Sequence, residues 1–168
     1  MRVTIIAALD ENRLIGTGSG LPWNLPRDRR HFREMASGKA MLLGRRTFEE
    51  MAGWFSDQRP IVLTRQANYR PPAGLPTGIV IASSIGAALD AARSRGESGL
   101  LVAGGGQIYG LALPFADELI LTEVAAALAG EVYFPNFSLQ DWEEISREPF
   151  GADAENRHAM SFVTYRRR

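Results

Sequence analysis

The sequence predicts a single α/β domain with a mainly parallel sheet and helices on both of its faces. Short apolar runs of strand length alternate with stretches at helical spacing, which is typical of parallel strands joined by crossover helices. The chain has 168 residues, the size of one domain, and no repeat or interdomain linker divides it. From Trp142 onward the pattern is longer and half polar, so Ala159–Tyr165 is expected to close the sheet as an antiparallel C-terminal strand.

Strands are predicted from apolar runs that are too short for a buried helix. The first run, Val3–Leu9, is apolar at every position except Thr4, which indicates a strand buried on both faces. The other predicted strands are Ala40–Leu43, Ile61–Leu63, Ile79–Ala82, Leu100–Ala103 and Leu119–Val124.

Helices are predicted where apolar residues recur at helical spacing. One begins at Pro26, whose fixed φ suits a helix start and whose missing N–H would be unpaired there. In another, Thr47–Met51, the residues Thr47 and Glu50 have the spacing of a capping box. The connection Asp10–Asn24 is long for a small domain, and loops of this length are usually functional, often as lids. The remaining predicted helices are Ile85–Arg95 and Gln107–Leu113.

The composition excludes several classes of function. Lys plus Arg and Asp plus Glu are equal at 19 each, so we expect no broad surface for nucleic acid or membrane. The chain has no cysteine, which excludes a disulfide framework and thiol catalysis. It has two histidines and no H-E-x-x-H, so no metal site is expected. No apolar run fits a signal peptide or a membrane span, and we expect a cytoplasmic protein.

The stretch Leu21–Met35 holds a carboxylate where a hydrophobic residue is expected. Asp28 should be desolvated there, which raises its pKa toward the range useful for proton transfer. The alternative is that Asp28 is an ordinary first-turn acid that interacts favourably with the helix dipole. The residues that share its helical face are Leu25, Phe32, Met35 and Ala36.

Three junctions between a strand and the next segment could bind one polyanion. In Leu100–Tyr109 a buried strand runs into three glycines and then a helix, so a phosphate could approach bare backbone N–H groups. The segment is not the usual dinucleotide fingerprint, because Tyr109 replaces its third glycine. The alternative to a phosphate site is a glycine turn that is needed only for tight packing of the strand and helix. Met41–Phe48 and Val62–Gln66 place arginines just beyond two further strand ends. Ligands of open α/β sheets bind at such carboxyl ends.

Seven segments of the chain share their order and spacing with one protein family. They are IIAALDENRLIG, LPWNLPRDRRHF, LLGRRTFEEM, IVLTRQ, VAGGGQIY, LILTEV and EVYFPNF. Together they resemble bacterial dihydrofolate reductase. The resemblance implies one domain, residues 1–168, on an eight-stranded, mainly parallel sheet. It also implies reduction of 7,8-dihydrofolate to tetrahydrofolate with NADPH as the cofactor. One compact domain suggests a monomer.

The resemblance assigns the catalytic role to Asp28, which would hold the amino and ring N–H groups of the pterin and promote protonation at N5. Trp23 and Thr122 would hold a water and hydrogen bonds around that carboxylate. Tyr109 would lie near the nicotinamide, and Leu21 would complete the catalytic set. The residues implied to wall the pterin and benzoyl groups are Ile6, Ala8, Leu21, Phe32, Met51, Phe55 and Ala103.

The resemblance also implies a set of residues around the cofactor. Arg65 near a 2′-phosphate favours NADPH over NADH. The pair Gly104–Gly105 would carry the cis peptide of the family, and Asp10–Asn24 would be the lid over the nicotinamide. The complete implied set is Ala8, Ile15, Gly16, Gly44, Arg45, Arg46, Thr47, Thr64, Arg65, Gly104, Gly105, Gly106, Gln107 and Ile108.

One departure from the family concerns the tail of the substrate. Gln58 stands where the family has the arginine that binds the glutamate of folate, and Arg59 follows one place later. We expect Arg59 to bind that carboxylate, because Pro60 fixes the backbone beside it. The alternative is that Arg29 or Arg33 takes over from the helix.

Two other functions remain open on the sequence. A reductase of the same fold could act on another pterin or on a riboflavin precursor, and the segment around Asp28 argues against the riboflavin precursor. A non-catalytic module that binds NADPH or folate is disfavoured by the intact set of Asp28, Trp23 and Thr122.

Overall fold

The computed structural model describes all 168 residues and has an eight-stranded sheet at its centre. The order in the sheet is β5-β4-β3-β6-β1-β7-β10-β9, and β10 alone runs in the direction opposite to the other strands. Two further short strands, β2 and β8, pair separately. The strands are β1 (Arg2–Leu9), β2 (Leu14–Gly16), β3 (Ala40–Gly44), β4 (Arg59–Leu63), β5 (Val80–Ala82), β6 (Gly99–Val102), β7 (Glu118–Val124), β8 (Val132–Tyr133), β9 (Trp142–Phe150) and β10 (Met160–Arg167). The α/β prediction and the antiparallel C-terminal strand are confirmed.

Helices cover both faces of the sheet because the strand side chains alternate between two apolar layers. In β1, Ile5 packs into the cluster that contains residues of α3 and α4, and Ile6 packs into the cluster that contains residues of α1 and α2. None of the helices is long and apolar enough to cross a membrane. The helices are α1 (Pro26–Ala36), α2 (Arg45–Glu50), α3 (Ile85–Ser94), α4 (Gly106–Ala112) and the short 3-10 helix η1 (Leu113–Phe115).

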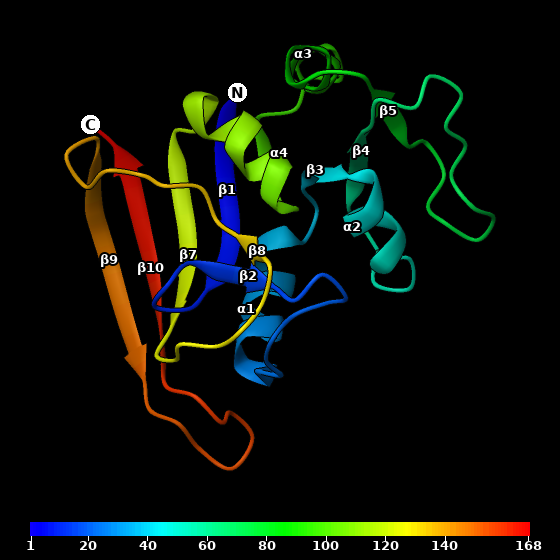
Figure 1. Cartoon of the computed structure of the whole chain (residues 1–168). Coiled ribbons are helices and arrows are strands. Elements are labelled where there is room, and N and C mark those ends of the chain that lie inside the picture. Colours follow the sequence, from blue (N-terminus) through cyan, green and yellow to red (C-terminus); the bar gives the residue numbers. More distant parts are fainter.

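The two edges of the sheet are built differently (Figure 1). At one edge, β9 and β10 form a long hairpin whose connection, residues 151–159, extends past the ends of the strands. At the other edge, the connection between β4 and β5 projects away from the sheet. Both chain termini lie at the same end of the molecule, because β1 and the antiparallel β10 respectively begin and finish there.

Two local predictions were wrong. Asp10–Asn24 is not a plain loop: it contains β2, which pairs with β8 more than a hundred residues later. A strand of three residues gives no usable periodicity, so the sequence did not reveal it. The capping box at Thr47 is absent, because α2 begins at Arg45 and its N-cap is Gly44 with no side-chain cap bond. Thr47 therefore lies inside the first turn of α2.

Candidate active site

Asp28 lies in the first turn of α1 with its side chain turned toward the sheet. Its exposed fraction is 8%, although its neighbours Arg29 and Arg30 are exposed. Burial raises the pKa of the Asp28 carboxyl, and the hydrogen bond from the Thr122 hydroxyl and the charges of His31 and Arg29 only partly oppose that increase. The prediction of a buried carboxylate with a raised pKa is confirmed.

Thr122 reaches Asp28 from the middle of the sheet. It lies on β7 and is paired with Ala8 on β1 and with Phe162 on β10. Its exposed fraction is only 3%. Trp23, from the segment before α1, is buried, and its Nε1 has no hydrogen-bond partner in the protein. A buried indole N–H normally has a partner, so this donor can hold a water or a ligand atom.

The apolar wall of the site forms one cluster. Its aromatic part is extended by Trp54, whose ring centroid lies 5.0 Å from that of Phe32 and 5.6 Å from that of Phe55. Trp54 was not among the predicted residues, although it stands directly beside Phe55 in the sequence. Leu21, in contrast, is 56% exposed and lies outside this cluster. The predicted wall residues that belong to the cluster are Ile6, Phe32, Met51, Phe55 and Ala103.

Tyr109 connects α4 to the central strand. Its hydroxyl donates a hydrogen bond of 2.8 Å to the backbone carbonyl of Ile6, and the ring packs on Phe134 with 5.1 Å between centroids. Burial, with a smaller contribution from the charge of Asp28, raises the pKa of Tyr109. Tyr109 therefore stays neutral, and its ring and hydroxyl pack against Gly104, where a Cβ would lie 3.2 Å from the hydroxyl.

The predicted cofactor residues meet at the carboxyl ends of β3 and β6. The Gly44 N–H donates to the Gly104 carbonyl at 2.7 Å, and the Gly104–Gly105 peptide bond is cis, as the resemblance implies. A Cβ on Gly105 would lie 3.2 Å from the Thr47 hydroxyl. A Cβ on Gly106 would lie 2.9 Å from Cγ1 of Val132. Bare backbone is therefore required where these elements meet.

β2 and the arginine-bearing junction complete this group. A Cβ on Gly106 would lie 3.8 Å from Ile15 of β2, which brings the predicted Ile15 and Gly16 beside the glycines. Gly44 is paired with Leu63, so Arg45 and Thr64 follow side by side beyond two neighbouring strand ends. The Arg45 guanidinium donates to Glu49 at 3.0 Å. The remaining predicted cofactor residues that are exposed to solvent are Arg46, Arg65 and Gln107.

Comparison with known proteins identifies the chemistry of this arrangement. The sequence model of the family described as dihydrofolate reductase matches residues 2–167. The chain belongs to the dihydrofolate reductase family. Family membership makes it an NADPH-dependent oxidoreductase that reduces dihydrofolate, as the sequence predicts.

Individual relatives of the dihydrofolate reductase family match nearly the whole chain. Dihydrofolate reductase type 3 of Salmonella typhimurium is 38% identical over 167 residues, which are 99% of each chain. The dihydrofolate reductase of Bacillus subtilis is 32% identical over 166 residues, 99% of this chain and 95% of the relative. A solved dihydrofolate reductase of Enterococcus faecalis, in complex with NADP(H) and RAB-propyl, superimposes with a TM-score of 0.85 at 27% identity, covering 99% of this chain and 96% of the other.

The arginines considered for the tail of dihydrofolate differ in their surroundings. Arg59 donates from Nε and one terminal nitrogen to both oxygens of Glu97, each at 2.7 Å. Arg33 is exposed, lies over the Trp54 ring at 5.3 Å from its centroid, and takes part in none of the ion pairs of the chain. Glu97 therefore occupies two of the three guanidinium nitrogens of Arg59 and neutralises its charge, and Arg33 has no such competitor. No pattern in the sequence indicates this pairing with Glu97.

The Gln58 side chain makes its hydrogen bonds within the protein. Its side chain accepts a hydrogen bond from the Ser56 N–H at 2.8 Å and donates to Asp57 at 2.7 Å. Asp57 in turn accepts from the Ser37 hydroxyl at 2.9 Å. Ser37 follows α1 directly, so these bonds connect the end of the site helix to the segment before β4.

Proposed function

We propose that Asp28 is the residue that promotes protonation of the substrate during dihydrofolate reduction. The observation that carries the proposal is a single carboxylate, 8% exposed, on the apolar face of α1. Its charged form is disfavoured by desolvation. Such a group holds a proton more readily than an exposed aspartate and can influence a nearby ring nitrogen.

The residues around Asp28 support distinct parts of this function. The unpaired Trp23 Nε1 and the Thr122 hydroxyl are the donors available to a water and to the carboxylate. The aromatic and aliphatic wall around Phe32 and Phe55 suits a flat pterin and a benzoyl group, and it excludes water. The carboxylate accepts hydrogen bonds from the amino and ring N–H groups of the pterin and promotes protonation at N5.

The glycine junction and the exposed arginines fit the cofactor. At Gly105 and Gly106 a Cβ would crowd Thr47 and Val132, so the glycines are needed for close packing. The proposed pyrophosphate site rests on the backbone N–H groups at the start of α4, which follows β6 and begins at Gly106 directly after Gly105. Arg46 at the start of α2 and Arg65 just after β4 are exposed and supply positive charge for a 2′-phosphate. NADPH supplies the hydride when bound. We also propose that the enzyme acts as a monomer, as expected for one compact domain of 168 residues.

For the tail of the substrate, we propose Arg33 as the available cation. It borders the wall formed by Phe32 and Trp54 and has no acidic partner. Arg59, the residue expected from the sequence, is less available because its charge is already paired with Glu97.

The test of the Asp28 proposal is the variant Asp28→Asn, with Glu34→Gln as its control. Both remove one negative charge from α1, but Glu34 lies on the exposed face. Positioned general acids contribute about a hundredfold or more to rate, so Asp28→Asn should lose at least that much kcat/KM at pH 7. Wild type should lose activity as pH rises through the pKa of Asp28. Wild-type rates for Asp28→Asn across pH 5–8 would return Asp28 to the role of an ordinary first-turn acid.

Thermal unfolding separates a catalytic loss from misfolding. Because the pKa of Asp28 is raised in the folded state, ionisation of this group opposes folding above that pKa, and the penalty disappears below the pKa of the unfolded state. Asp28→Asn should therefore be at least as stable as wild type at pH 7, with no advantage at pH 3. A large loss of Tm in Asp28→Asn at pH 7 would contradict this predicted direction of the stability change.

A further inference from the structure

The start of α1, the helix that carries Asp28, lacks a capping side chain of its own. Its N-cap residue is Leu25, whose side chain has no acceptor, and Pro26 is the first helical residue. Because Pro26 has no N–H, the first backbone N–H of the helix that needs a partner is that of Arg27. Arg27 directly precedes Asp28, so whatever binds this N–H also influences where the carboxylate lies.

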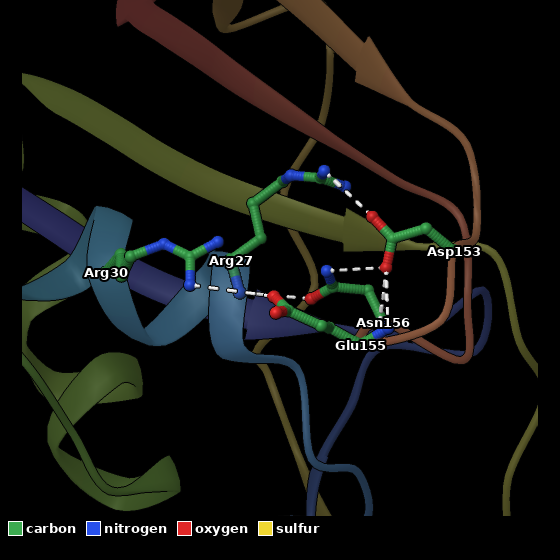
Figure 2. A network of polar contacts seen from close by, with 5 residues as sticks. All are labelled: Arg27, Arg30, Asp153, Glu155 and Asn156. Carbon is green, nitrogen blue, oxygen red and sulfur yellow. Dashed lines mark hydrogen bonds and ion pairs between the residues drawn. The ribbon is translucent and has the colours of Figure 1, made fainter.

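The partner comes from the connection between β9 and β10. Oδ1 of Asn156 accepts the hydrogen bond from the Arg27 N–H at 3.0 Å, across 129 residues of sequence (Figure 2). Asn156 has an exposed fraction of 0%. A fully buried amide is costly unless its polar atoms are bonded, and here its oxygen serves the helix. Asn156 therefore acts as a cap supplied by another part of the chain.

Asp153 fixes the Asn156 side chain in this position. Its Oδ1 accepts hydrogen bonds from the Asn156 N–H at 2.7 Å, from Nδ2 of Asn156 at 3.0 Å and from the Glu155 N–H at 2.9 Å. Its other oxygen accepts from the Arg27 guanidinium at 3.0 Å. The backbone and side-chain bonds from Asn156 are the leading causes that lower the pKa of Asp153 to about 2. The carboxylate is therefore ionised throughout the neutral range.

The outer contacts of the same network are weaker. Arg30 and Glu155 approach to 4.0 Å (Figure 2), and their side chains are 61% and 69% exposed. An ion pair in water at this distance contributes little. The Arg30–Glu155 contact therefore adds little to the way the network holds the helix.

We propose that Asn156 is a positioning residue for the reaction, which caps α1 from the β9–β10 connection and thereby holds Asp28 in its buried place beside Thr122. The inference rests on the role proposed for Asp28. Without the amide, the Arg27 N–H needs water, the first turn of α1 opens, and the carboxylate becomes more hydrated. Asn156 itself touches neither substrate nor cofactor.

The groups that face Asp28 are unchanged by substitution of Asn156. They are His31 and Arg29 on α1, the Thr122 hydroxyl on β7 and the Tyr109 hydroxyl on α4. A shift in the pH profile of an Asn156 variant therefore reports a change in the position or hydration of Asp28.

The experiment compares Asn156→Ala with Ser84→Ala. Ser84 caps α3 through a bond of 3.1 Å from the Ala87 N–H, so the control removes the same kind of interaction from a helix without site residues. Small displacements of a catalytic group are costly, and we expect Asn156→Ala to lose on the order of tenfold in kcat/KM at pH 7. The descending limb of its profile should move to lower pH, because a more hydrated carboxylate has a lower pKa. Ser84→Ala should lower Tm alone.

A second pair of variants distinguishes the cap from the ion pair and replaces Asn156→Ala if that variant does not fold. Asp153→Asn keeps an acceptor for Asn156 but loses the charge that pairs with Arg27, and its profile should resemble that of wild type. Asp153→Ala frees the Asn156 side chain, and its profile should shift as described for Asn156→Ala. Amide hydrogen exchange at Arg27 should become faster in the two alanine variants.

The outcomes separate this inference from the proposal for Asp28. In one outcome, Asp28→Asn is inactive, but Asn156→Ala (or Asp153→Ala in its place) has a wild-type pH profile and only a lower Tm. The positioning role of Asn156 is then wrong, and the role of Asp28 remains. If Asp28→Asn keeps the wild-type rate and pH profile, the role of Asp28 is wrong, and the positioning role fails with it.

Discussion

Asp10 connects two segments that border the site, and its removal should destabilise the protein strongly. It directly follows β1 and has an exposed fraction of 4%. One carboxylate oxygen accepts from the N–H groups of Asn12 and Leu14 at 2.8 and 2.9 Å. The other accepts from the Leu128 N–H at 2.8 Å, across 118 residues. The carboxylate thus joins the start of the Asp10–Asn24 segment to the connection after β7.

The three hydrogen bonds to Asp10 set the size of the expected loss of stability. Hydrogen bonds to a charged group contribute about 1.5–3 kcal/mol each. Of the three, only the bond from Leu14 is fully buried, and water can partly replace the others. We therefore expect Asp10→Ala to lose about 3–5 kcal/mol, which is about 6–20 °C in Tm for a chain of this size. Asp10→Asn keeps one acceptor oxygen but turns an NH₂ toward a donor, and it should lose about 1–3 kcal/mol.

Urea and thermal unfolding, followed by circular dichroism, measure both variants. Asp90→Ala is the matched control, because Asp90 pairs only with Arg93 and the two side chains are 76% and 59% exposed. The control should change stability by less than about 0.5 kcal/mol. Amide exchange at Leu14 and Leu128 should accelerate in the Asp10 variants. The reasoning is refuted if Asp10→Ala is as stable as Asp90→Ala. It is also refuted if Asp10→Asn is less stable than Asp10→Ala.

Two further predictions concern specificity. Arg65→Gln should raise the KM for NADPH about tenfold and leave the KM for NADH unchanged, because an exposed charge-assisted bond to a 2′-phosphate contributes on the order of 1.5 kcal/mol. Equal effects on the two KM values in steady-state assays would contradict this prediction. Arg33→Gln should raise the KM for dihydrofolate about tenfold and leave that for a dihydropterin without the glutamate tail unchanged. Arg59→Gln serves as the comparison, and the reverse pattern would assign the tail to Arg59.

The central features were predictable because they depend on local patterns. Buried parallel strands are continuous apolar runs, and the run Val3–Leu9 gave β1 to within one residue. Asp28 was detectable because a carboxylate interrupted an apolar helical face, and burial does raise its pKa. The three glycines after β6 were visible as a place where side chains are excluded, and the contacts around Gly105 and Gly106 show why.

The features that escaped prediction depend on partners far away in the chain. β2 was missed because its three residues form a strand only against β8. The expectation for Arg59 took no account of Glu97, which lies 38 residues away and binds two of the three guanidinium nitrogens. No local pattern contains that information, since an arginine before a strand has the same sequence signal whether it is free or paired.

The start of α1 lies between these two cases. Pro26 correctly indicates where the helix begins, but Leu25 at the N-cap cannot accept a hydrogen bond. The sequence therefore shows that a cap is missing without showing what replaces it. A helix that lacks a local cap has its N-terminal geometry set by tertiary structure, here by Asn156 and Asp153. With the role proposed for Asp28, we expect changes in the β9–β10 connection to affect the reaction, although none of the residues assigned to the substrate or cofactor sites lies in this connection.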